Sequence, residues 1–136
     1  MTLETPLAPS AAIEGLTERF DPIERIDQRA LRGAARPGSL AHGRYLEVVG
    51  PDRTLLIPLR EGALHIGRGL AAHLRLEDMS VSRRHAILVS DAEGARILDD
   101  RSSNGTCVNG AEVQHAELSD GDVITLGRFA LRYLVV

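Results

Sequence analysis

Residues 45–59 read YLEVVGPDRTLLIPL, and this stretch decides the fold class of the chain. Two runs rich in apolar residues, 45–49 and 53–59, flank the cluster Gly50-Pro51-Asp52. β-Branched and aromatic side chains favour strands, whereas glycine, proline and aspartate favour turns. The stretch therefore predicts two strands joined by a turn.

Runs of the same kind continue from this stretch to the end of the sequence. Further short strands are predicted at 63–66, 74–76, 86–89, 95–98, 106–108, 123–126 and 129–135. Turn signals at such regular spacing are typical of an all-β sandwich.

In the other direction, before about residue 40, the periodicity is helical. Asp21 is predicted to be an N-cap, Pro22 the first helical residue and Glu24 the acidic residue of a capping box. Gly33 is a suitable helix end. The apolar positions of this helix would form one stripe: Ile23, Ile26, Ala30 and Leu31.

A shorter helix is predicted within 10–20, and residues 36–39 read as a linker. We therefore divide the chain into a partly helical or flexible N-terminal extension, residues 1–42, and a β domain, residues 43–136. The apolar stripe of the extension has three possible uses: it docks on the sandwich, binds a partner, or pairs with a second copy of the chain.

The composition bounds the function. A length of 136 residues fits one domain plus an extension. No apolar run is long enough for a membrane helix and the start lacks a secretory signal, so the expected location is the cytoplasm, without a membrane partner. The single cysteine, Cys107, permits no internal disulfide and is expected to be a small buried hydrophobe.

The charge pattern excludes further classes of protein. The net charge of −3 argues against a general nucleic-acid binder. All 16 basic residues are arginine, so no lysine can act as a base or a phosphate ligand. Any strong cationic contact must come from a guanidinium group, which can grip a phosphate with two parallel hydrogen bonds.

Three stretches carry most of the chemistry, and all three fall in predicted turns. They are His65-Ile66-Gly67-Arg68, Ser80-Val81-Ser82-Arg83-Arg84-His85-Ala86, and Asp99-Asp100-Arg101-Ser102-Ser103-Asn104-Gly105-Thr106. Together they offer hydroxyl, guanidinium, imidazole and amide groups.

A phosphate on a peptide would use these groups together, since it carries about −1.5 to −2 charges and three acceptor oxygens. Arg68 would neutralise it, Ser82 would donate from its hydroxyl and its backbone N–H, and Asn104 would bind the peptide backbone. Each charge-assisted hydrogen bond contributes about 1.5–3 kcal/mol, so two or three give roughly micromolar binding.

Two other readings of these residues are weaker. Ser82 and His85 would suit a hydrolase only with an orienting acid and a nucleophile elbow, and Ser82 lacks the flanking glycines of such an elbow. The other four histidines lack metal-ligand spacing, so we expect no metal, no cofactor and no enzymatic activity.

The order and spacing of the motifs resemble those of forkhead-associated (FHA) domains over about residues 43–136. The motifs are Gly67-Arg68, Ser82-x-x-His85, Asn104-Gly105, Asn109-Gly110 and Asp120-Gly121-Asp122-Val123-Ile124-Thr125-Leu126-Gly127. The resemblance implies an eleven-stranded β-sandwich that reads phosphothreonine through loops at one end.

The resemblance also implies a role for each matching residue. Arg68 and Ser82 would hold the phosphate, and Arg83 would face the ligand. Asn104 would grip the peptide main chain, with a hydroxyl contact from Ser103 beside it. Gly67, His85 and Gly105 would be structural, and His85 would brace the loop.

The expected function is a phosphothreonine-peptide binding adaptor in Ser/Thr kinase signalling, with kinases or their substrates as partners. The alternative is a scaffold or self-association module that binds unphosphorylated protein surfaces. Some bacterial members of the family carry an N-terminal threonine that, once phosphorylated, folds back onto the binding loops. Thr5 and Thr17 are candidates for such a threonine.

Overall fold

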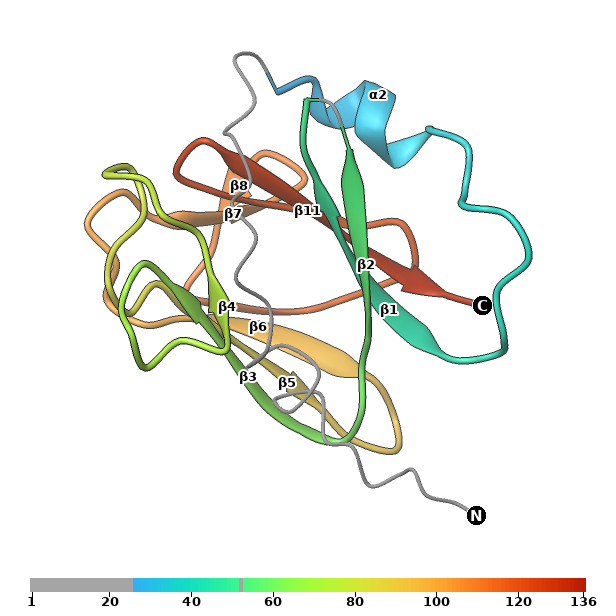
Figure 1. Ribbon diagram of the computed structural model, residues 1–136. Helices are drawn as coiled ribbons and strands as arrows, with labels where there is room; N and C mark the ends of the chain where they lie inside the picture. Colours follow the sequence, from blue (N-terminus) through green and yellow to red (C-terminus); the bar gives the residue numbers. More distant parts are fainter. Residues whose placement is uncertain (1–25, 52) are drawn as a thin grey trace.

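A computed structural model describes residues 26–51 and 53–136, which form a sandwich of two β-sheets and one short helix (Figure 1). The strands are β1 (Arg44–Val49), β2 (Thr54–Pro58), β3 (Gly62–Gly67), β4 (Leu74–Arg75), β5 (Ala86–Ser90), β6 (Ala95–Asp99), β7 (Thr106–Val108), β8 (Ala111–Glu112), β9 (His115–Glu117), β10 (Val123–Leu126) and β11 (Phe129–Val135).

The two sheets confirm the predicted all-β sandwich. One has six strands in the order β2-β1-β11-β10-β7-β8, and the other has five in the order β4-β3-β5-β6-β9. Only β3 and β4 pair in parallel; the other pairings along the described chain are antiparallel. The nine strands predicted individually are present, and β8 and β9 are added to them.

The core lies between the sheets and follows from the two-residue period of the strands. Leu46 and Val48 of β1 are fully buried, and so are Leu88 of β5 and Ile97 of β6 from the opposite sheet. Phe129 is also fully buried. Because the two inner faces supply one continuous apolar cluster, the sandwich holds its loops on a rigid frame.

Helix α2 spans Gln28–Arg32, which is shorter than the predicted helix. Its N-cap is Asp27, whose carboxylate accepts a hydrogen bond from the backbone N–H of Ala30 at 3.0 Å. Ile26 and Asp27 are not helical, so the predicted continuous helix is wrong at these residues. Gly33 is the C-cap, as predicted.

Other expectations for the extension concern residues 1–25, which lie outside the described residues. They are the N-cap at Asp21, the shorter helix at 10–20, and the candidate phosphoacceptors Thr5 and Thr17.

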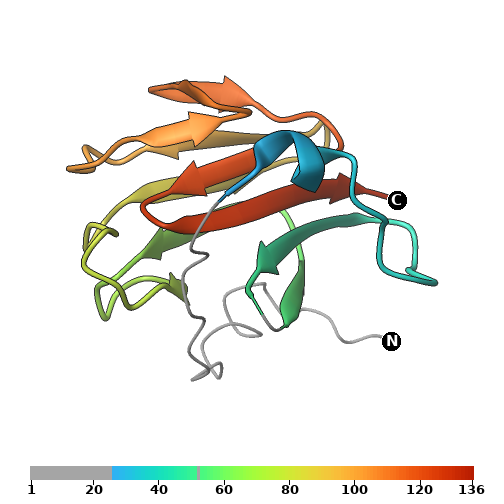
Figure 2. The same ribbon diagram turned by 90° about the horizontal axis from the view of Figure 1, so that it is seen from above.

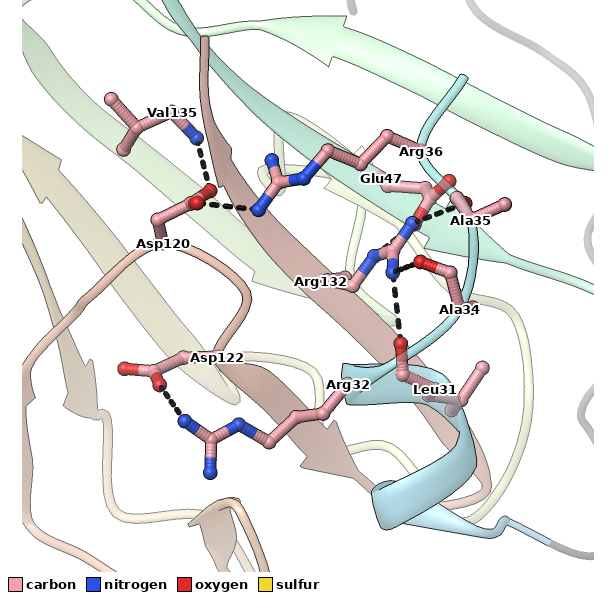
Figure 3. Close-up of polar contacts among 10 residues, drawn as sticks. All are labelled: Leu31, Arg32, Ala34, Ala35, Arg36, Glu47, Asp120, Asp122, Arg132 and Val135. Atoms are coloured by element: carbon pink, nitrogen blue, oxygen red, sulfur yellow. Dashed lines mark hydrogen bonds and ion pairs between the residues drawn. The ribbon is translucent and has the colours of Figure 1, made fainter. Parts of the chain in front are cut away.

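Polar contacts centred on Arg132 hold α2 against the six-stranded sheet (Figure 3). Arg132 of β11 faces Glu47 of β1 across the strand pair, and its Nε donates to the Glu47 carboxylate at 2.7 Å. Its terminal nitrogens donate to the backbone carbonyls of Leu31 and Ala34, each at 2.9 Å, and of Ala35 at 3.1 Å. The Arg132–Glu47 ion pair lies on the face of the sheet turned away from the core. It is nevertheless buried, because α2 and the turn that follows α2 cover it.

Two further arginines join this contact at its edges. Arg36 forms an ion pair with Asp120, and Arg32 lies 3.7 Å from Asp122 (Figure 3). The predicted apolar stripe is less evident, since Ala30 is exposed and Leu31 only partly buried. In Figure 2, α2 lies over the strands β10 and β11 of the six-stranded sheet.

The composition predicted that the chain has no membrane helix and that Cys107 is buried, and the described residues bear on both points. The helix at residues 28–32 is too short to cross a membrane, and residues 26–51 and 53–136 contain no longer one. Cys107 lies in β7 and is partly buried, with its thiol free.

Candidate functional site

Three loops gather at one end of the sandwich, on the left in Figure 1. They join β3 to β4, β4 to β5, and β6 to β7. They carry the three stretches singled out in the sequence, although the first stretch begins within β3 and only Arg68 follows the strand. Helix α2 lies away from this end in both views (Figures 1 and 2). We refer to the three loops together as the loop surface.

The end of β3 lies against the β4–β5 loop at very short range. Arg68 N–H donates to the carbonyl of Ser82 at 2.9 Å, and Gly69 N–H donates to the carbonyl of Arg83 at 3.1 Å. A Cβ atom on Gly67 would lie 2.1 Å from the Arg83 carbonyl oxygen, far inside contact distance. Gly67 is therefore required by space, because any side chain would push the two loops apart.

Arg68 is partly buried, and its inner nitrogen is already used. Its Nε donates to the carbonyl of Val81 at 2.9 Å, which fixes the direction of the side chain. Its two terminal nitrogens have no hydrogen-bond partner within the described chain. A positioned guanidinium with two unused nitrogens is suited to an oxyanion.

Ser82 offers its hydroxyl proton rather than its backbone N–H. Its Oγ accepts a hydrogen bond from Ser103 N–H at 2.9 Å, which leaves the hydroxyl proton to donate elsewhere. Its backbone N–H donates to Nδ1 of His85 at 3.0 Å. The expectation that this N–H serves the ligand is therefore wrong in this structure.

His85 is fully buried and joins two of the loops. Because Nδ1 accepts from Ser82 N–H, the ring proton is on Nε2, which donates to the carbonyl of Gly105 at 2.8 Å. Neither ring nitrogen bonds to the Ser82 hydroxyl, as the base of a hydrolase would. The arrangement is that of a brace between the β4–β5 and β6–β7 loops.

Asp99 shapes the β6–β7 loop. Its carboxylate accepts from the Ser102 hydroxyl at 2.5 Å, from Ser102 N–H at 3.1 Å and from the Thr106 hydroxyl at 2.7 Å. Burial acts to raise the pKa of Asp99, but these hydrogen bonds and the nearby His85 hold it below its ordinary value. This role of Asp99 was not predicted, although Asp-x-x-Ser is a recognisable loop pattern.

Two residues in a left-handed backbone conformation flank the tip of the same loop. Arg101 has φ of 57° and Gly105 has φ of 87°, both in the left-handed region. Gly105 N–H donates to the Ser102 hydroxyl at 2.9 Å. These contacts present Ser103 and Asn104 outward, and both side chains are exposed.

Asn104 is tied to the neighbouring loop through one half of its amide. Its Nδ2 donates to the carbonyl of Ser80 at 2.9 Å, while its Oδ1 has no partner within the described chain. That oxygen is an acceptor of the kind a peptide N–H requires. The Ser103 hydroxyl likewise has no partner among the residues the structure describes.

Ser80 is a second residue whose role was not predicted. Its hydroxyl donates to Asp78 at 2.5 Å and accepts from Arg128 N–H at 3.0 Å. A Cβ atom on Gly127 would lie 2.5 Å from the Ser80 hydroxyl oxygen, so the β10–β11 turn packs directly against this loop. Hydrogen bonds from Ser80 are the main reason that the pKa of Asp78 is lowered.

The rim of the loop surface is positively charged. Arg83 is exposed, and the Arg84 side chain is 72% exposed with its Nε 3.0 Å from Asp100. The described residues contain no group of His, Cys, Asp and Glu side chains suited to a metal ion. The surface thus combines unused guanidinium and hydroxyl donors with an amide acceptor, in a way that suits a phosphorylated peptide.

Fold and loops together define a β-sandwich that presents unused hydrogen-bonding groups on braced loops at one end. The model of the FHA domain family matches residues 64–127. Two relatives match this chain over most of their own length. The chain therefore belongs to the FHA domain family.

Two of these relatives have lengths close to that of this chain. The oxoglutarate dehydrogenase inhibitor of Corynebacterium jeikeium is 31% identical, over 93% of this chain and 91% of the relative. The glycogen accumulation regulator GarA of Mycolicibacterium smegmatis is 33% identical, over 85% of this chain and 77% of the relative. Both are named for regulation rather than for catalysis.

Other relatives are much longer. The chain spans 11% of an ABC transporter ATP-binding/permease protein and 13% of the FHA domain-containing protein FhaA, both of Mycobacterium tuberculosis. Identity to FhaA is 54% over 51% of this chain.

A solved structure from work on phosphothreonine-dependent FHA domain interactions is 44% identical, with a TM-score of 0.62 over 68% of this chain and 96% of that one. The FhaA FHA domain, solved in complex with the intracellular domain of Rv3910, is also 44% identical. Its TM-score is 0.60 over 67% of this chain and 99% of that one.

Proposed function

We propose that this chain binds phosphothreonine-containing segments of partner proteins through the loop surface and acts as a non-enzymatic regulator in Ser/Thr kinase signalling. The observation that carries the proposal is the pair of unused donors at Arg68 and Ser82. Each is fixed by its remaining hydrogen bonds, to Val81 and to Ser103 respectively.

Each loop residue has one task in this proposal. The Arg68 terminal nitrogens and the Ser82 hydroxyl hold the phosphate, and Arg83 adds positive charge beside it. The Asn104 Oδ1 accepts from the peptide main chain, and Ser103 adds a hydroxyl contact. The site is preorganised, because Gly67, His85 and Gly105 hold the loops before a ligand arrives.

The partner is a protein in this proposal, since the related FhaA domain was solved with the intracellular domain of another protein. We place the function in the cytoplasm and propose that Ser/Thr kinases or their substrates are the partners. We also propose that residues 43–136 form the binding domain and 1–42 an extension of it.

Isothermal titration against three matched peptides tests the proposal. The peptides carry phosphothreonine, phosphoserine or unmodified threonine at one position. We expect micromolar binding of the phosphothreonine peptide, weaker binding of the phosphoserine peptide, and no measurable binding of the third. Arg68→Ala and Ser82→Ala should each weaken binding by about 2–3 kcal/mol, the loss of one charge-assisted hydrogen bond. Unchanged affinity in both variants would contradict the site assignment.

A second function is favoured by one observation. Leu70 is 87% exposed and Met79 is 82% exposed, and both lie on the loop surface. Exposed large apolar side chains suit contact with a protein surface that need not be phosphorylated. Equal affinity for the phosphorylated and unmodified peptides would favour this scaffold function.

A further inference from the structure

A pocket opens beside the proposed phosphate site, where the β3–β4 loop meets the start of β5. Its volume is about 410 Å³, enough for several side-chain atoms of a peptide. Buried Ile66 and Ala86 form its base, and exposed Arg83 and Arg84 its rim. Arg83 therefore belongs both to this pocket and to the proposed phosphate site.

The polar groups of the pocket are mainly donors. His73 Nδ1 accepts a hydrogen bond from His65 N–H at 2.9 Å, so its ring proton is carried on Nε2. Arg84 uses Nε for Asp100, and its terminal nitrogens have no hydrogen-bond partner in the described chain. Asp100 is the only acidic residue in the lining and is already paired. The pocket therefore has more donors than acceptors and suits an anionic group.

The pocket and Asn104 contact different parts of the β4–β5 loop. Asn104 bonds to Ser80, near the beginning of the β4–β5 loop, whereas Arg83 and Arg84 stand near its end. Ser82 comes between them along the loop, and its carbonyl accepts a hydrogen bond from Arg68 N–H at 2.9 Å. A peptide whose phosphate lies beside Arg83 would therefore bring one of its neighbouring side chains to the pocket.

We propose that this pocket is a second subsite for the same peptide and takes an anionic side chain that flanks the phosphothreonine. The anionic group is a carboxylate or a second phosphate, which share the chemistry that the donors require. The proposal rests on the proposed function and adds a sequence preference to it.

Peptide arrays with a fixed phosphothreonine test the subsite. Each of the four positions on either side carries alanine, glutamate or phosphothreonine in turn, and affinity is measured by fluorescence anisotropy. We expect a gain of about three- to tenfold over alanine at one or two positions, all on one side. The glutamate and phosphothreonine arms show which of the two anionic groups the pocket prefers.

Two variants and one control assign the gain to the pocket. Arg84→Gln removes the cation, and Ala72→Leu fills the pocket without changing any charge. Both should abolish the gain from the anionic residue. Arg96→Gln is the matched control, because Arg96 is also exposed and paired to an aspartate, Asp91, but lies outside the lining of the pocket. It should keep the gain.

A direct readout complements the affinities. The Ala86 methyl resonance should shift when a peptide with the anionic residue is added, and less with the alanine peptide. A gain that survives in both pocket variants, or no gain at any position, overturns the subsite while phosphopeptide binding stands. If no phosphopeptide binds better than its unmodified form, the proposed function itself fails.

Discussion

Single residues on the loop surface act mostly by holding other residues in place. His85, Asp99 and Gly67 have no group free for a ligand, yet each fixes a loop that carries one. His85 bonds to Ser82 and Gly105 from a fully buried position. Losses at such residues should therefore be visible in stability or loop geometry as well as in affinity.

Gly67→Ala tests the close approach of the two loops. Its Cβ would meet backbone atoms of Arg83, which can yield only if the β4–β5 loop shifts. We expect a loss of about 2–4 kcal/mol in the free energy of unfolding and a marked loss of phosphopeptide affinity. Urea denaturation and titration measure both.

Gly94→Ala is the control for that variant, since a Cβ there meets no atom within 4 Å. It should leave stability nearly unchanged. A Gly67→Ala protein as stable as the Gly94→Ala protein would show that the loops are not packed as tightly as described.

His85→Ala should lower the free energy of unfolding by about 3 kcal/mol. It leaves the N–H of Ser82 and the carbonyl of Gly105 without their partner and opens a cavity. Native-state hydrogen exchange should show faster exchange at the Ser82 amide. The preference among bound phosphopeptides should change less than stability; a fully stable variant that fails to bind would contradict the role of a brace.

The lowered pKa of Asp99 predicts a pH dependence. Because the folded-state pKa lies below the ordinary 3.8, the ionised carboxylate stabilises the fold above that pH, and this stabilisation is lost as the pH falls through the folded-state value. The stability difference between the natural protein and Asp99→Asn should therefore be largest near neutral pH and shrink below about pH 4. Urea denaturation between pH 3 and 7 measures it, and a difference independent of pH would be inconsistent with this reasoning.

At the scale of elements, the described part of the extension is joined to the sandwich through β11. Arg132 is buried with Glu47 because α2 and the following turn cover it. Removing one partner of a buried ion pair leaves an uncompensated charge, whereas replacing both with apolar residues is often tolerated.

Arg132→Met should accordingly destabilise the protein by about 3–5 kcal/mol, and the double variant with Glu47→Leu should recover much of that loss. Thermal and urea denaturation of the three proteins provide the measurement. If the double variant were no more stable than Arg132→Met, the carbonyl contacts to α2 rather than the unpaired Glu47 would account for the loss.

Sequence patterns predicted most elements, and the exceptions have physical causes. Strands β1 and β11 could be predicted from their runs of apolar residues, many of which are buried. Strands β8 and β9 span only Ala111–Glu112 and His115–Glu117, and exposed strands of this length carry no alternation. Asp27 caps α2 and was not predicted as a cap, while the predicted N-cap, Asp21, lies outside the described residues.

The site followed the same division. The residues proposed to touch the ligand stand in recognisable motifs, so their place on the loops could be predicted. The resemblance also implied that His85 is a brace, but the atoms that it joins could not be predicted, because one of its partners is a carbonyl 20 residues away. The partner of Asn104 is likewise a carbonyl 24 residues away. Contacts to backbone atoms leave little trace in the identity of the partner residue.

At the scale of the whole molecule, the loop surface lies at one end of the sandwich and α2 lies elsewhere on it (Figure 1). Interactions at distant sites without shared partners are expected to be additive. The ion pair of Arg36 with Asp120 is substantially exposed, with side-chain exposures of 43% and 42%, so it should contribute less than about 1 kcal/mol.

Arg36→Ala should therefore change stability only slightly and leave phosphopeptide affinity unaltered. Denaturation and calorimetric titration of the same preparation check both expectations. A clear change in affinity would show that the described part of the extension communicates with the loop surface.

The Arg132 contacts have a consequence for how this segment can diverge. Arg132 binds three main-chain oxygens, of Leu31, Ala34 and Ala35, and none of their side chains. The Arg132 side chain thus recognises the path of the backbone, and its contacts do not depend on which side chains the three residues carry. Evolution, or a protein engineer, is free to rewrite these three positions while the segment stays attached, provided that β11 keeps its arginine.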